Sequence, residues 1–89
     1  MKRVIWKYEM ESRDFTVKMP KGAQILSCQM QGELLSIWAL VDEAAPKEAR
    51  RFKSFGTGEK VDISPKKLKF IGTVQATRGL MVHHIFEVL

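Results

Sequence analysis

The sequence has few features that would mark a membrane, secreted or disulfide-bonded protein. It contains one cysteine, Cys28, so no intrachain disulfide can form. The longest apolar run, near residues 34–41, is interrupted by Ser36 and is far shorter than the roughly 18 residues that span a bilayer. The first ten residues lack the continuous apolar stretch of a secretory signal. We therefore expect a cytosolic protein with no membrane segment.

Residue patterns for metal binding and catalysis are also scarce. His83 and His84 are neighbours on a predicted strand, so their side chains point to opposite faces and cannot share one metal ion. Cys28 lies among apolar residues with no candidate base near it in sequence, and we interpret it as a packed thiol. We expect no metal, no cofactor and no enzymatic activity, although an active site assembled from distant residues stays open.

The composition is that of one small folded domain. The 89 residues are 45% hydrophobic and 28% charged, well away from the composition of disordered chains. Two independent cores cannot be built from so few residues, so we predict a single β-rich domain over 1–89. Because a domain of this size has a narrow stability margin that a subunit interface can widen, we expect a homo-oligomer.

Positive charge is concentrated in one part of the chain. The formal net charge is +5, and residues 47–78 hold nine Lys or Arg against three Asp or Glu, whereas residues 1–46 hold six of each. Such asymmetry can mark a surface for nucleic acid, a nucleotide or an acidic protein. It can equally serve only to keep a small protein soluble, and the sequence leaves both readings open.

Alternation of apolar and polar residues predicts about seven short strands. We place them at residues 3–10, 15–19, 24–30, 34–41, 50–55, 68–73 and 80–88. The polar residues 11–14 predict a hairpin between the first two strands, and the turn at 77–79 predicts a hairpin between the last two. The strand at 34–41 is apolar on both faces, which predicts a central position, and Gly32 before it suits a tight turn.

No helix of ordinary length is predicted. Pro46 interrupts the segment between the fourth and fifth strands, and the longest irregular segment follows Gly56, with a short turn begun by Ser64 and Pro65. These features predict an all-β fold in which mainly antiparallel strands form a small sandwich or barrel.

The glycine-rich turn at residues 55–58 is the candidate ligand site. Successive backbone amides in such a turn can bind an anion, and basic residues flank it. The candidate anion-binding residues are Arg50, Arg51, Lys53, Phe55, Gly56, Thr57, Gly58 and Lys60. The turn lacks the G-x-x-x-x-G-K-[ST] spacing of a nucleotide loop, so the glycines can also serve only to reverse the chain.

Four aromatic residues could stack nucleic-acid bases if they were exposed beside the basic segment. They are Trp6, Tyr8, Trp38 and Phe52. Their alternating placement on predicted strands favours burial instead. We single out Trp38 as a candidate interface residue, because Ile37 and Ala39 occupy the other face of its strand.

An ordered set of short segments resembles a family of small uncharacterised bacteriophage and prophage proteins. The segments are IWKY at 5–8, MPKGA at 19–23, WALVD at 38–42, FGTG at 55–58, FIGT at 70–73 and HIFE at 84–87. The resemblance covers nearly the whole chain. The family has no assigned activity, so it supplies no functional residues.

The resemblance implies a phage accessory protein made in the cytoplasm of the infected bacterial host. Small phage proteins of this kind often act by stoichiometric binding, and many counter host defence by blocking an immune protein or by sequestering a nucleotide signal within a homo-oligomer. The alternative hypothesis is a nucleic-acid-binding protein that uses the basic segment 47–78.

Overall fold

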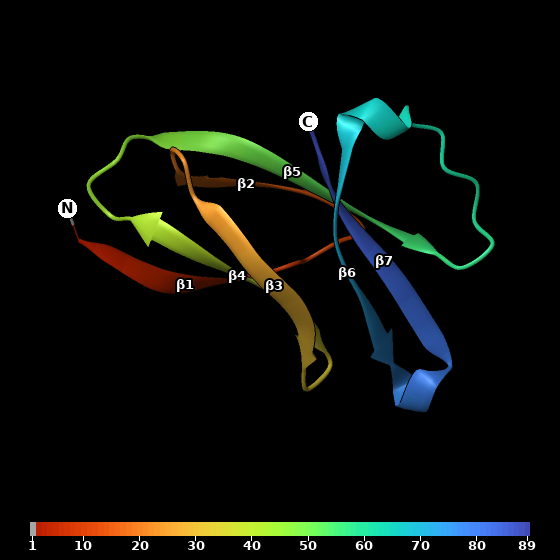
Figure 1. Ribbon diagram of the computed structural model, residues 1–89. Coiled ribbons are helices and arrows are strands. Elements are labelled where there is room, and N and C mark those ends of the chain that lie inside the picture. The colour runs from red at the N-terminus through yellow and green to blue at the C-terminus, as the bar shows by residue number, and fades with distance from the viewer. Residues whose placement is uncertain (1) are drawn as a thin grey trace.

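The computed structural model describes residues 2–89, which form seven strands and two single-turn 3₁₀ helices (Figure 1). The strands are β1 (Arg3–Glu9), β2 (Asp14–Pro20), β3 (Gln24–Gln31), β4 (Leu34–Asp42), β5 (Lys47–Gly56), β6 (Leu68–Ala76) and β7 (Met81–Val88). The 3₁₀ turns are η1 (Pro65–Lys67) and η2 (Thr77–Gly79). The all-β prediction is therefore confirmed. Within residues 2–89, no helix has the length and apolar character needed to cross a bilayer.

The strands form two antiparallel sheets that pack face to face as a small sandwich. One sheet has the order β1-β4-β3 and the other β2-β5-β7-β6. The central position of β4 and the β6–β7 hairpin are both confirmed, and Gly32 has φ +62° in the tight β3–β4 turn. The sheets are separate, so the sandwich alternative holds and the barrel alternative is wrong.

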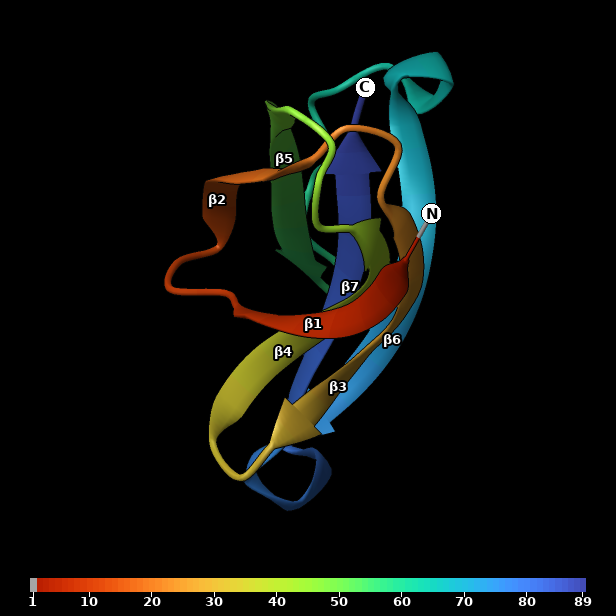
Figure 2. The same cartoon turned by 90° about the vertical axis from the view of Figure 1, so that its left-hand side faces the viewer.

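The predicted hairpin between β1 and β2 is wrong. β1 pairs with β4, from Arg3 opposite Asp42 to Glu9 opposite Ser36, and β2 pairs with β5 in the other sheet (Figure 2). The polar connection at residues 10–13 carries the chain from one sheet to the other. This crossing lets the apolar faces of β1 and β2 pack into one core from opposite sheets. Alternation within each strand cannot distinguish these two arrangements.

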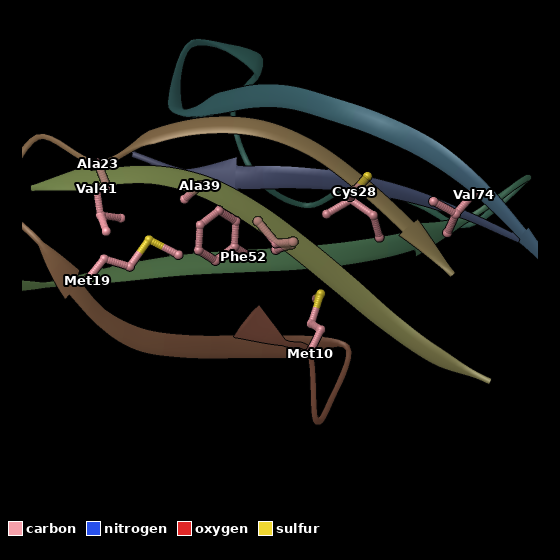
Figure 3. Packing of buried hydrophobic residues seen from close by; sticks show 10 residues of the cluster. Met10, Met19, Ala23, Cys28, Ala39, Val41, Phe52 and Val74 are labelled. Carbon is pink, nitrogen blue, oxygen red and sulfur yellow. The ribbon is translucent and has the colours of Figure 1, made fainter. Parts of the chain in front are cut away.

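The core lies between the sheets. Met19 and Phe52 from the four-stranded sheet lie in one cluster with Val41 from β4 (Figure 3). Ile37 of β4 belongs to the same cluster, and all four side chains are fully buried. Full burial of such side chains stabilises the fold by about 1.5–3 kcal/mol each. The sequence-predicted packing of Cys28 is confirmed, since its thiol is buried and burial raises its pKa.

One side of the sandwich is closed by contact between β3 and β6. A Cβ added at Gly72 in β6 would lie 3.0 Å from the Cys28 Sγ in β3, so a larger residue at this position would push the two strands apart. Both strands also carry a register irregularity here, between Ile25 and Ser27 and between Phe70 and Gly72. Bulges of this kind bend an edge strand, and the bent strands can then meet across the sandwich.

Candidate functional site

The two adjacent arginines of the candidate anion site point to opposite faces of β5. Arg51 lies on the outer face, where its Nε and Nη2 donate to the two carboxylate oxygens of Asp14 at 2.8 and 2.7 Å. This pairing holds the pKa of the Asp14 carboxyl below its usual value. Arg50 points between the sheets instead. The structure therefore does not bring these arginines together at one site.

Arg50 belongs to a buried ion pair. Its guanidinium donates to both carboxylate oxygens of Glu87 in β7 and, through Nη1, to the carbonyl oxygen of Ala23 at 2.9 Å. The side chains of Arg50 and Glu87 are only 16% and 6% exposed, and the hydrogen bonds to Glu87 raise the pKa of Arg50. An arginine committed in this way joins β5, β7 and the turn after β2, and it is not available to an external phosphate.

The glycine turn already holds an anionic group of the chain itself. The Gly56 amide donates to Glu59 Oε1 at 2.9 Å, and Arg13 Nη2 donates to the same oxygen. The hydrogen bond from Gly56, followed by the contribution of Arg13, lowers the pKa of the Glu59 carboxyl. Gly58 has φ +86°, which lets the turn close over this carboxylate. The Glu59 carboxylate thus occupies the position predicted for a ligand.

The remaining candidate residues of the turn hold the loop after β5 against the outer face of the sheet. Lys53 Nζ lies 5.1 Å from the centre of the Phe55 ring and 3.6 Å from Asp62 Oδ1. Phe55 is only 2% exposed, so it offers no stacking surface. Thr57 Oγ1 lies 2.7 Å from His84 Nε2. Lys60 is exposed in the same loop.

The four aromatic residues considered for base stacking do not form an exposed platform. Phe52 is fully buried, and Trp6 and Tyr8 pack partly buried against the core. Trp38 lies on the outer face of β4, opposite Lys7 of β1 and Ser27 of β3, and is half-buried. It is the one member of the four that lies away from the core, as the alternation in its strand predicts.

The two histidines lie on opposite faces of β7, as predicted. His83 points between the sheets, where its Nδ1 lies 3.2 Å from Ser54 Oγ. His84 points outward, with Thr57 and Thr73 hydroxyls on its two ring nitrogens. Within residues 2–89, no group of three or more His, Cys, Asp or Glu side chains is arranged to hold a metal ion.

A cleft of about 450 Å³ opens between the sheets at one end of the sandwich, and the sequence did not reveal it. It lies where the β1–β2 connection, the β3–β4 turn and the β6–β7 turn meet. Its lining residues are Met10, Glu11, Ser12, Arg13, Met30, Glu33, Leu34, Leu35, Ser54, Ala76, Thr77, Met81 and His83. This volume falls in the range of small-molecule sites, about 300–1,000 Å³.

The cleft combines adaptable apolar walls with a few polar groups. Met10, Met30 and Met81 line it, and the flexible thioether side chain of methionine fits ligands of varied shape. The Ser54 hydroxyl and His83 ring form one polar pair, and Arg13 Nη2 lies 3.2 Å from the Ser54 carbonyl oxygen. Such a site can bury an apolar or planar body and bind a polar or anionic group at its edge.

The turn that borders the cleft contains unusual backbone geometry. Thr77 and Arg78 have φ of 52° and 55°, in the left-handed region that non-glycine residues seldom adopt. Strain of this kind costs about 1–3 kcal/mol per residue and is concentrated at functional sites. The one signal in the sequence is the predicted turn at 77–79, which Ala76, Met81 and His83 flank, since the remaining lining residues come from segments distant along the chain.

Comparisons with other proteins place the chain in one family. Among curated proteins and among solved structures, no match to the chain is found. The model of the family described as a domain of unknown function, DUF7352, matches residues 1–89. The protein therefore belongs to the DUF7352 family.

Proposed function

We propose that this protein acts by stoichiometric binding, and that the inter-sheet cleft holds a small molecule with a planar or apolar body and an anionic group. The observation that supports this most is the meeting of methionine walls with Arg13, Ser54 and His83 in one cleft of about 450 Å³. The glycine turn is a weaker candidate, because the Glu59 carboxylate already occupies it.

The two parts of the ligand would be recognised by different groups. The body inserts between Met10, Met30 and Met81, and the Ser54–His83 pair offers hydrogen bonds to its polar edge. The anionic group binds Arg13, whose side chain is 58% exposed and whose guanidinium exchanges the Glu59 carboxylate for the ligand. A nucleotide, with a planar base and a phosphate, belongs to this chemical class.

We carry the biological role over from the resemblance to small phage proteins. In that setting the protein counters a defence of the infected bacterium by sequestering a nucleotide signal in the host cytoplasm. Blocking of a host immune protein is the other form of this proposal, with the half-buried Trp38 on the outer sheet face as the contact.

The test is native mass spectrometry of the protein purified from infected cells, followed by calorimetric titration with the ligand so identified. We expect added mass on the wild type and recovery of the ligand unchanged after denaturation. Arg13→Gln should weaken binding about 10- to 100-fold, because it removes a charged hydrogen bond. Arg51→Gln is the matched control, since Arg51 is also an exposed arginine paired with a carboxylate but lies away from the cleft. Bare protein, or equal effects of both variants, would contradict the proposal.

Nucleic-acid binding is the second candidate, favoured by lysines on the outer face of β2 and β5. Lys18 and Lys47 are exposed on this face, which also carries Arg51. This hypothesis predicts that the affinity for a polynucleotide falls steeply with salt, and that Lys18→Glu with Lys47→Glu reduces both the affinity and the salt slope. Salt-independent binding, or none, would exclude it.

A further inference from the structure

The edge of β1 differs from the other sheet edges of the molecule. β3 and β6 carry register irregularities and contact each other, and β2 ends in Pro20. β1 pairs with β4 over seven residues with no irregularity and contains neither proline nor glycine. Natural proteins usually protect an edge strand with such devices, because an unprotected edge pairs with another strand. Among the described edges, β1 is the one without a proline, a register irregularity or a contacting edge strand, and its protection is limited to the charged side chains Arg3, Lys7 and Glu9.

The backbone groups of β1 alternate between its two sides. The Met10 amide donates to the Leu35 carbonyl oxygen of the β4 strand at 2.8 Å, in continuation of the β1–β4 register. Even-numbered residues of β1 therefore direct their N–H and C=O groups toward β4, and odd-numbered residues direct theirs toward the open edge. The backbone N–H and C=O groups available to a further strand are therefore those of Ile5, Lys7 and Glu9.

The inner face of β1 is incompletely covered. Val4, Trp6 and Tyr8 are only half-buried, whereas the β4 residues paired with them, at positions 41, 39 and 37, are fully buried. Three apolar side chains thus remain partly open at the edge of the core. On the outer face, Ile5 is 60% exposed. A further strand at this edge would cover all four side chains.

We infer that the occupant of this edge is the β1 strand of a second copy of the chain, paired antiparallel about a two-fold axis at Trp6. The two three-stranded sheets would then form one continuous sheet of order β3-β4-β1-β1-β4-β3. A two-fold interface of this kind is closed, so assembly stops at the dimer. This inference goes beyond the proposed ligand binding and does not depend on it.

The side chains select one register for this pairing. With Trp6 opposite Trp6, Arg3 faces Glu9 of the second copy, Ile5 faces Lys7, and Val4 faces Tyr8. A shift of two residues in one direction would place Arg3 opposite Lys7, and in the other direction Lys7 opposite Lys7. Opposite charges across a strand pair stabilise it and like charges destabilise it, so the Trp6-centred register is favoured.

Charge exchange tests the interface. Light scattering with size-exclusion chromatography should find that the wild type is a dimer. Glu9→Arg places two arginines opposite each other at both ends of the strand pair, so it should weaken the affinity of dimerisation about tenfold or more. Arg3→Glu combined with Glu9→Arg should restore the dimer. Asp62→Arg makes the same charge change in the exposed loop after β5, away from β1, and should leave the dimer intact. A monomeric wild type at about 100 μM, or a Glu9→Arg dimer as tight as that of the wild type, would overturn the inference.

Disulfide trapping tests the register separately. Ile5 and Lys7 lie on the outer face, where cysteine should not disturb the core. A mixture of Ile5→Cys and Lys7→Cys proteins should form a mixed disulfide, because facing Cα atoms of a hydrogen-bonded pair lie about 5.5 Å apart. Neither variant should cross-link with itself. Self-cross-linking of Ile5→Cys or of Lys7→Cys would indicate one of the shifted registers and overturn the Trp6-centred one.

Discussion

The glycine turn and the inter-sheet cleft both gather polar groups, and they differ in what satisfies those groups. In the turn, the Gly56 amide and Arg13 converge on the carboxylate of Glu59, which comes from the same loop. In the cleft, Ser54 and His83 pair with each other beside open space lined by methionines. A segment rich in glycine and charged residues can therefore satisfy its polar groups with hydrogen bonds from its own chain, whereas an open cleft leaves room for a ligand.

The largest effect should separate the two neighbouring arginines of β5. Arg50→Ala leaves the carboxylate of Glu87 buried without its partner, which should lower the free energy of unfolding by about 3–5 kcal/mol. Arg51→Ala removes an exposed, solvent-screened pair and should lower the free energy of unfolding far less. Urea denaturation monitored by tryptophan fluorescence measures both. Equal losses in the free energy of unfolding would contradict the assignment of Arg50 and Glu87 as a buried ion pair that stabilises the sheet.

A smaller effect should distinguish the polar pair of the cleft from the turn. Ser54→Ala removes the hydroxyl that contacts His83 and should lower the free energy of unfolding by about 1 kcal/mol. If the cleft is the binding site, the same variant should also lower the affinity for the ligand found by native mass spectrometry roughly tenfold. Thr57→Ala removes the hydroxyl that contacts the other histidine, His84, and is the matched control. Its ligand affinity should match that of the wild type.

The smallest effect concerns the carboxylate in the glycine turn and depends on pH. Because the folded state lowers the pKa of Glu59, its contribution to stability is present above the ordinary value of 4.5 and is lost as the pH falls through the lower folded value. The wild type should therefore be more stable than Glu59→Gln at neutral pH, and the difference should shrink in acid. Paired urea titrations from pH 7 to pH 3 measure this difference. A difference that grows in acid would contradict the assigned pairing.

The same variant sharpens the comparison between turn and cleft. Glu59→Gln leaves Arg13 without its carboxylate, so anionic ligands of the cleft should bind it more tightly than they bind the wild type. An unchanged affinity would mean that Arg13 does not exchange Glu59 for the ligand.

Local pattern in the sequence was enough to predict the strands and several of their relations. Alternation predicts that Trp38 lies on the opposite face of β4 from Ile37 and Ala39, and that His83 and His84 lie on opposite faces of β7, because a strand repeats every two residues. Gly32 predicts the β3–β4 turn because glycine readily adopts a positive φ, and the structure has φ +62° there. The β6–β7 hairpin follows from a short turn between two alternating segments.

The tertiary structure alone decided which strands distant in sequence pair and which charges meet. β1 pairs with β4 although more than twenty residues lie between them in sequence, and Arg50 forms an ion pair with Glu87, which is 37 positions away. The cleft draws its lining from three separate connections. A strand's alternation fixes its two faces but carries no information about its neighbour, so pairing, burial of charge and the cleft depend on contacts that form only when the whole chain folds.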